Sequence, residues 1–294
     1  MKKLIVEKKY NNQKLNKFLF EKFPNLKQST LYKTLRKKDI KINNKRVSEN
    51  VIIHSGDEIQ VFIADGLLMS PSNIFNLEII YEDKNIIIIN KPANIEVTGN
   101  LNCLSYHVKQ YCKSHGENFV EPCHRLDRNT IGLVLFAKNE ESLSILLEKF
   151  KQKEIEKHYI AVVHGLFKEK QNRLIAYLFK DKKKSLVYIS DTPKKGYSEI
   201  ITSYSVLKEN KSDNYSILDI NLETGRTHQI RAHFAHIKHP IIGDGKYGYN
   251  EINKKFKVKT QMLCSYKIKF NFSGDNKILN YLNGFCCTIN VPFQ

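Results

Sequence analysis

The sequence predicts an α+β protein of two domains, a small basic domain followed by a larger one in which a sheet carries helices. Three observations lead to this prediction. Residues 15–63 combine two short helical patterns with short β-branched runs. Residues 77–238 mix strand patterns with amphipathic helices. The length of 294 residues suits a compact enzyme with one appended domain.

The first domain, residues 1–65, is expected to be a small α+β unit. Apolar residues recur at helical spacing over 15–22 and 28–38, and the second of these segments is densely basic. Short β-branched runs joined by polar turns predict strands at 40–42 and 59–63.

The second domain is expected to span residues 77–294, after a linker at 66–76 that contains Gly, Ser and Pro without periodicity. Two β-branched runs around a charged turn predict a hairpin that opens this domain at residues 77–89. Asn139 is expected to cap a helix that carries apolar residues through Phe150. The remaining patterns predict strands at 133–137, 159–163 and 215–222 and a helix at 227–238, which must end before Pro240.

The charge favours a polyanionic partner. Lys and Arg number 48 against 30 Asp and Glu, which gives a net charge of +18 and a pI of about 9.5. Nucleic acid is the leading class of partner, although general lysine richness would also raise the charge.

The apolar stretch at the N-terminus is too short for a signal peptide. No later window of the sequence approaches the ~18 apolar residues of a membrane span. We therefore expect a cytoplasmic protein that does not interact with membranes. The six cysteines form no Cys-x-x-Cys pair, which fits reduced thiols and argues against disulfides or structural zinc.

The segment HRLDRNTIGLVLFAKN at residues 124–139 is the first candidate for chemistry. Asp127 stands among His124, Arg125 and Arg128, just ahead of an apolar strand. Nearby cations favour an ionised carboxylate, which acts as a nucleophile or a base. The alternative is a surface Asp–Arg pair that only holds a loop.

Two further segments carry candidates. Tyr159 opens a strand and offers an aromatic face and a hydroxyl to a base, although in isolation it also reads as a core tyrosine. In LETGRTHQIRAHFAHIKHPIIGDGKYG, residues 222–248, a Thr-Gly turn places Arg226 at the mouth of a helix, with His228 and Arg231 on one face. Arginine at such a place pairs with a carboxylate or grips phosphate.

Four histidines in the third segment raise a metal site as an alternative. His228, His233, His236 and His239 are dense, but the last three turn gradually round the helix and have no acidic residue at ligand spacing. We expect these histidines to cap, pack and hydrogen-bond, and we predict no metal.

Taken in order, these segments resemble the RluA-type family of pseudouridine synthases. The resemblance rests on NKPAN at 90–94, HRLDRNTIGL, KHYIA and TGRTHQIRAHFAHIKHPIIGD, and it covers residue 77 to the C-terminus. The segments KLNKFL, IKINNKRV and GDEIQV of the first domain resemble an S-four-like RNA-binding domain, a frequent companion in relatives similar to RluC and RluD. For the second domain, the resemblance to the RluA-type family implies a mixed, mainly antiparallel central sheet flanked by helices and loops.

The resemblance implies a role for each matching residue. Asp127 would be the essential carboxylate, Tyr159 the platform and proton participant beside the uracil, and Arg226 the ion-pair partner of Asp127. Arg125 would enter the stack that the flipped nucleotide leaves. The residues expected to bind substrate are His124, Arg125, Arg128, Lys91, Ile230 and Arg231.

The implied reaction detaches uracil from ribose, rotates it and rejoins it through carbon 5, without a cofactor. Whether Asp127 attacks the sugar, adds to the base or removes a sugar proton stays open. The expected partner is RNA, with large-subunit ribosomal RNA favoured and transfer RNA the alternative, and the expected state is a monomer. Three positions depart from the family pattern: Asn94 and Lys238 replace Gly, and Ile131 replaces Ser.

Two other classes of function compete with this interpretation. A non-enzymatic RNA-binding or ribosome-assembly protein would explain the charge and the first domain, but not three matches at catalytic positions. A metal-dependent hydrolase would use the histidines and predicts loss of activity with a chelator.

Overall fold

The computed structural model describes residues 2–23, 26, 28–62, 76–99, 102–181 and 183–293. The chain forms two compact units, residues 1–76 with 100–102 and residues 77–99 with 103–294. The predicted linker at 66–76 lies outside the described residues, apart from Asn76. Each unit is described by itself below.

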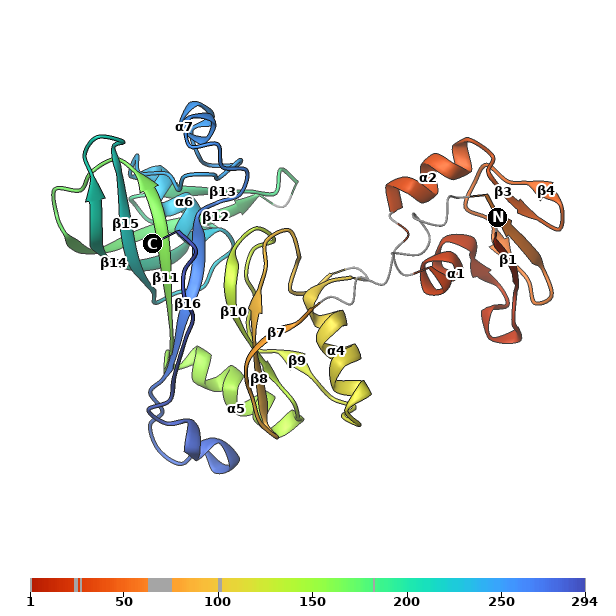
Figure 1. Cartoon of the computed structure of the whole chain (residues 1–294), viewed down its shortest axis with the longest axis horizontal. Helices are drawn as coiled ribbons and strands as arrows, with labels where there is room; N and C mark the ends of the chain where they lie inside the picture. Colours follow the sequence, from red (N-terminus) through yellow and green to blue (C-terminus); the bar gives the residue numbers. More distant parts are fainter. Residues whose placement is uncertain are drawn as a thin grey trace. The chain divides into compact units, whose positions relative to one another are not determined.

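The N-terminal unit is an antiparallel four-stranded sheet, in the order β1-β6-β3-β4, with two helices (Figure 1). Its elements are β1 (Lys2–Ile5), η1 (Lys8–Tyr10), β2 (Gln13–Lys14), α1 (Leu15–Lys22), α2 (Gln28–Arg36), β3 (Ile40–Ile42), β4 (Lys45–Arg46), β5 (Ile52–Ile53) and β6 (Glu58–Val61). Strands β2 and β5 form a separate pair.

The helices of this unit form because each one buries a single apolar stripe. Phe18 of α1 and Leu31 of α2 are fully buried in a common core. The α1 prediction is confirmed, whereas α2 ends two residues early because Lys38 has a left-handed backbone (φ 56°). The opposite side of α2 exposes basic residues, including Lys33 and Arg36. This unit therefore presents a cationic helix face on a well-packed core.

The larger unit is built on an 11-stranded sheet, in the order β13-β12-β14-β15-β11-β16-β10-β8-β7, with β9 beside β10 and β17 beside β16 (Figure 1). Its first elements are β7 (Glu78–Glu82), β8 (Ile86–Lys91), α4 (Leu104–Ser114), β9 (Glu121–Pro122), β10 (Ile131–Ala137), α5 (Glu140–Lys151) and β11 (Ile155–His164). The remainder are β12 (Gln171–Asp181), β13 (Leu186–Ser190), β14 (Ser198–Asn210), β15 (Tyr215–Leu222), α6 (Gln229–His236), α7 (Asn250–Lys255), β16 (Leu263–Phe270), η2 (Lys277–Leu282) and β17 (Cys286–Thr288).

The expected α+β fold with a mixed, mainly antiparallel sheet is confirmed. Strands β10 and β16 pair in parallel, and the other described pairings in this sheet are antiparallel. Gly132 makes the parallel contact feasible, because a Cβ atom there would lie 2.2 Å from the carbonyl oxygen of Ser265. Its φ of +110° is also one that side chains rarely adopt.

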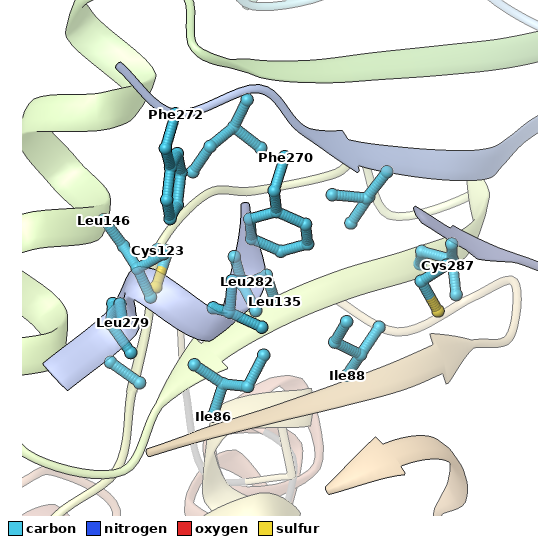
Figure 2. Close-up of a cluster of buried hydrophobic side chains, with 14 residues drawn as sticks. Ile86, Ile88, Cys123, Leu135, Leu146, Phe270, Phe272, Leu279, Leu282 and Cys287 are labelled. Carbon is cyan, nitrogen blue, oxygen red and sulfur yellow. The ribbon is translucent and has the colours of Figure 1, made fainter. Parts of the chain in front are cut away.

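Strand β10 lies between β16 and β8 in the sheet, and both of its faces are buried. On one face, Leu133 and Leu135 join a core that α5, η2 and β16 complete, as Figure 2 shows around Leu146, Leu279 and Phe270. Helix α5 begins as predicted, since the side chain of Asn139 accepts a hydrogen bond from the Ser142 N–H at 2.8 Å. A rigid core therefore supports the loop that precedes β10.

Helix α6 packs at the other end of the sheet, where Ala232 joins a cluster with side chains of β12, β13 and β14. The sequence pattern predicted a helix from 227 to 238, but His228 and Lys238 have left-handed backbones (φ 54° and 66°) and bound it on both sides. The pattern did not predict α4, α7, β12, β13, β14 or β16. No helix among the described residues is long and apolar enough to cross a membrane.

Candidate active site

Asp127 lies in the loop that joins β9 to β10. Buried neighbours tie this loop down: the Thr130 N–H donates to the Asp127 carbonyl at 3.1 Å, and Gln261 donates to the Thr130 hydroxyl at 2.6 Å. The Leu126 side chain is buried beside it. The Asp127 side chain, which is 24% exposed, is thus held by an anchored backbone.

Arg231, in the first turns of α6, is the ion-pair partner of Asp127. Its Nη1 donates to Asp127 Oδ2 at 2.8 Å, while Nε and Nη2 donate to the two oxygens of Asp244 at 2.7 and 2.9 Å. Asp244 is fully buried and also accepts the backbone N–H groups of Lys246 and Tyr247. Asp244 therefore fixes the plane of the guanidinium that meets Asp127.

The charge states follow from this geometry. Burial opposes the charge of Arg231, but Asp244 and Asp127 outweigh burial and raise its pKa above the ordinary value. Burial would likewise raise the pKa of Asp244, but Arg231 and the backbone donors lower it below the usual range. The site holds one cation between two carboxylates.

The predicted pair between Arg226 and Asp127 is wrong. Arg226 precedes α6, is exposed, and makes no ion pair with Asp127 in the described part of the chain. Its backbone N–H donates to the Gln229 side chain at 3.0 Å. The helix starts at residue 229, which carries Arg231 rather than Arg226 onto the buried face.

Tyr159 reaches the same site from β11. A register shift between His158 and Tyr159 lets Tyr159 pair with Ser265 of β16, and the residue is only 4% exposed. Burial raises the pKa of the Tyr159 hydroxyl, with a smaller contribution from the charge of Asp127. The hydroxyl therefore stays protonated.

An open cleft of about 820 Å³ joins these groups. Its walls include Asp127, Tyr159 and Arg231, together with Arg226 and Ile230. The predicted substrate-binding residues Arg125, Arg128 and His124 also line it. A cleft of this size accommodates a nucleotide.

His124 is held in the wall of this cleft. Its Nε2 accepts a hydrogen bond from the Leu135 N–H at 3.1 Å, and its ring packs 5.3 Å from that of Phe150. Burial lowers the pKa of His124 to about 3, with Lys157 as a second cause, so the ring is neutral. The histidine ties the Asp127 loop to β10, and its contact with substrate stays a prediction.

The structure contradicts the prediction that Lys91 binds substrate. Lys91 is 0% exposed, and its ammonium donates to the carbonyls of Pro92, Ile95 and Arg128 at 2.9, 2.9 and 3.1 Å. Burial lowers its pKa to about 8, which Asp127 partly opposes. Lys91 instead ties the NKPAN loop to the loop that carries Asp127.

Replacing Lys91 by Met should destabilise the larger unit, because three backbone carbonyls lose the buried ammonium that donates to them. We expect a loss of about 3 kcal/mol in the free energy of unfolding, measured by denaturant titration. The matched control is Lys151→Met, since that lysine is 79% exposed at the end of α5. Equal stability of the two variants would contradict this role for Lys91.

The four histidines of the third segment have separate partners. His228 contacts the Tyr247 hydroxyl, His233 that of Thr202, His236 the Asp191 carboxylate, and His239 the His164 carbonyl. The described residues contain no group of three or more candidate ligands that would hold a metal. The expectation that these histidines pack and hydrogen-bond is confirmed.

Comparison with known proteins identifies this arrangement. Residues 85–236 match the family model described as RNA pseudouridylate synthase. A protein of Buchnera aphidicola named ribosomal large subunit pseudouridine synthase C is 33% identical over 95% of this chain and 96% of its own length. The chain belongs to the pseudouridine synthase family. An uncharacterized RNA pseudouridine synthase of Mycoplasma capricolum is 35% identical, with 96% of this chain and 95% of that relative covered.

The fold agrees with this membership. The structure of human RNA pseudouridylate synthase domain containing 4 superimposes with a TM-score of 0.60 at 20% identity, covering 73% of this chain and 88% of that one. The synthase is therefore an isomerase that converts uridine to pseudouridine in RNA, and the cleft is its candidate active site.

Two departures from the family pattern have a simple structural reason. Asn94 and Lys238 stand where Gly is usual, and both adopt left-handed backbones (φ 68° and 66°). Asn tolerates this conformation better than most residues. Both positions thus have a backbone conformation that favours Gly, and Arg128 donates to the Asn94 carbonyl at 3.3 Å.

Asp244 and Tyr247 are site residues that the sequence pattern did not reveal. Both lie in GDGKYG, the end of the segment that carries the family resemblance. The available signal was Asp244, an acidic residue that follows the helix of Arg231. The same pattern is equally typical of a turn on the surface.

Proposed function

We propose that the synthase modifies specific uridines of large-subunit ribosomal RNA, with Asp127 as the catalytic carboxylate. The observation that carries this proposal is the ion pair of Asp127 with a buried arginine at the end of a nucleotide-sized cleft. Two relatives from Buchnera aphidicola that are named ribosomal large subunit pseudouridine synthase C support the choice of RNA. Transfer RNA is the second candidate substrate, because it offers the same nucleotide.

Each of these residues of the cleft has its own role in the proposed reaction. Arg231 orients the Asp127 carboxylate, as attack on the sugar, addition to the base or removal of a sugar proton requires. Tyr159 covers one face of the detached uracil and donates a hydrogen bond from its protonated hydroxyl. The walls retain the base while it rotates, which separates this reaction from hydrolysis.

The target uridine must leave its stack to enter the cleft. Unstacking costs a few kcal/mol and favours loops, bulges and weak pairs. Arg125 is exposed at the rim, two residues before Asp127, where it can occupy the space that the nucleotide leaves. The rim of the cleft thus couples flipping of the target uridine to binding of the RNA.

Phosphate contacts supply the remaining affinity. The N-terminal unit, which we propose to be an S-four-like RNA-binding domain, exposes the basic face of α2. With a net charge of +18 for the chain, RNA affinity should fall as salt rises. We further propose that the synthase acts in the cytoplasm as a monomer and needs no cofactor.

The test is a comparison of pseudouridines in total RNA from cells with and without this protein. The expected result is the loss of pseudouridine at defined positions of large-subunit ribosomal RNA, restored by the wild-type chain. Purified protein should form the same pseudouridines in a transcript of that RNA, in the presence of a chelator. Loss confined to transfer RNA would overturn the ribosomal assignment, and inhibition by the chelator would favour metal-dependent chemistry.

A further inference from the structure

His228 lies beside Asp127. The sequence pattern gave it no role in the reaction, and the chemistry proposed above does not use it. It directly precedes α6 with a left-handed backbone (φ 54°), and its side chain is 16% exposed. Its Nε2 lies 4.0 Å from Asp127 Oδ2. A left-handed backbone is uncommon for a residue other than Gly, so the surrounding contacts hold His228 in place.

Tyr247 determines which nitrogen of His228 carries the proton. The Tyr247 hydroxyl accepts the Val187 N–H at 3.0 Å, and it lies 2.8 Å from His228 Nδ1. Among the described residues the hydroxyl has no other acceptor for its own proton, so it donates to Nδ1. The proton of the neutral imidazole therefore sits on Nε2, the nitrogen that faces Asp127.

The two oxygens of Asp127 have different surroundings. Oδ2 accepts Arg231 Nη1 at 2.8 Å and faces His228, whereas Oδ1 has no hydrogen bond within the described ranges of the chain. Arg231 is the donor within hydrogen-bond distance of Oδ2, and a charged donor lowers the basicity of the oxygen that accepts it. The other oxygen keeps its lone pairs available to the cleft.

We propose that His228 is a positioning residue, whose Nε2–H joins Arg231 in holding Oδ2 of Asp127 and leaves Oδ1 as the oxygen that reacts. This rests on the proposed catalytic role of Asp127. The 4.0 Å separation shortens to a hydrogen bond when substrate fills the cleft, as catalytic contacts commonly do. Burial lowers the pKa of His228, with Asp127 opposing, which agrees with a neutral donor.

The first test compares two replacements of His228 in single-turnover assays on the RNA transcript. Gln retains an N–H near the position of Nε2, and Leu retains bulk without a donor, while both carry the same backbone strain. We expect His228→Leu to lower the rate on the order of 100-fold with little change in RNA affinity, and Gln to restore most of it. Equal rates for the two variants would overturn the proposal.

The second test reads the protonation of His228 directly, and its first arm uses the wild-type chain. With ¹⁵N-labelled histidine, NMR of the wild-type synthase should show His228 protonated at Nε2, and Tyr247→Phe should shift the tautomer toward Nδ1. A wild-type ring protonated at Nδ1 would refute the proposed hydrogen bond. Failure of the proposed function is recognised separately, since the wild type would then form no pseudouridine and the tautomer would be unaffected.

Discussion

Replacing Asp127 by Asn abolishes pseudouridine formation, with a fall in the single-turnover rate of at least about 10³-fold. The amide has nearly the shape of the carboxylate but cannot attack a sugar, add to a base or accept a proton as an anion. Arg231 keeps its two hydrogen bonds to Asp244 in this variant, so the fold and the cleft are retained. RNA affinity, which depends mainly on phosphate contacts, should stay close to that of the wild type.

The matched control for this variant is Asp213→Asn. Asp213 pairs with Lys255 at 3.2 Å on the surface, away from the cleft, and its side chain is 46% exposed. The control should turn over normally and bind RNA normally. Turnover by Asp127→Asn at the rate of the control would remove the catalytic role of Asp127 and leave the family membership untouched.

Replacing Arg231 by Met should damage both stability and turnover. The substitution leaves Asp244 buried without its cation, and loss of one partner of a buried pair costs about 3 to 5 kcal/mol. Asp127 also loses the donor that orients Oδ2, so the rate should fall on the order of 100-fold in whatever fraction stays folded. Denaturant titration and single-turnover assays measure the two effects separately.

Two companion variants separate these effects. Adding Asp244→Asn to Arg231→Met removes the unpaired charge and should recover part of the stability but none of the rate. Arg226→Gln changes an exposed residue, so stability should move by less than about 0.5 kcal/mol while RNA affinity weakens. If Arg226→Gln lost more turnover than Arg231→Met, the assignment of Arg231 as the partner of Asp127 would be wrong.

Local patterns in the sequence were sufficient for much of the fold. The helix after Asn139 and the strand Tyr215–Leu222 were predicted because capping and alternation are local properties. Strands β12, β13 and β14 were missed because many of their residues are exposed, so their apolar alternation is incomplete. The family was predictable because four separate segments carry its motifs in order.

The sequence by itself determined the family, the catalytic Asp127 as a candidate and the placement of Tyr159 in a strand beside it. Only the tertiary structure decided which arginine meets Asp127 and that Lys91 is buried. Residues 127 and 231 are 104 positions apart, and their contact depends on where α6 begins. The left-handed backbone of His228 sets that start, turns Arg231 inward and leaves Arg226 outside, and helical periodicity alone does not encode such a start.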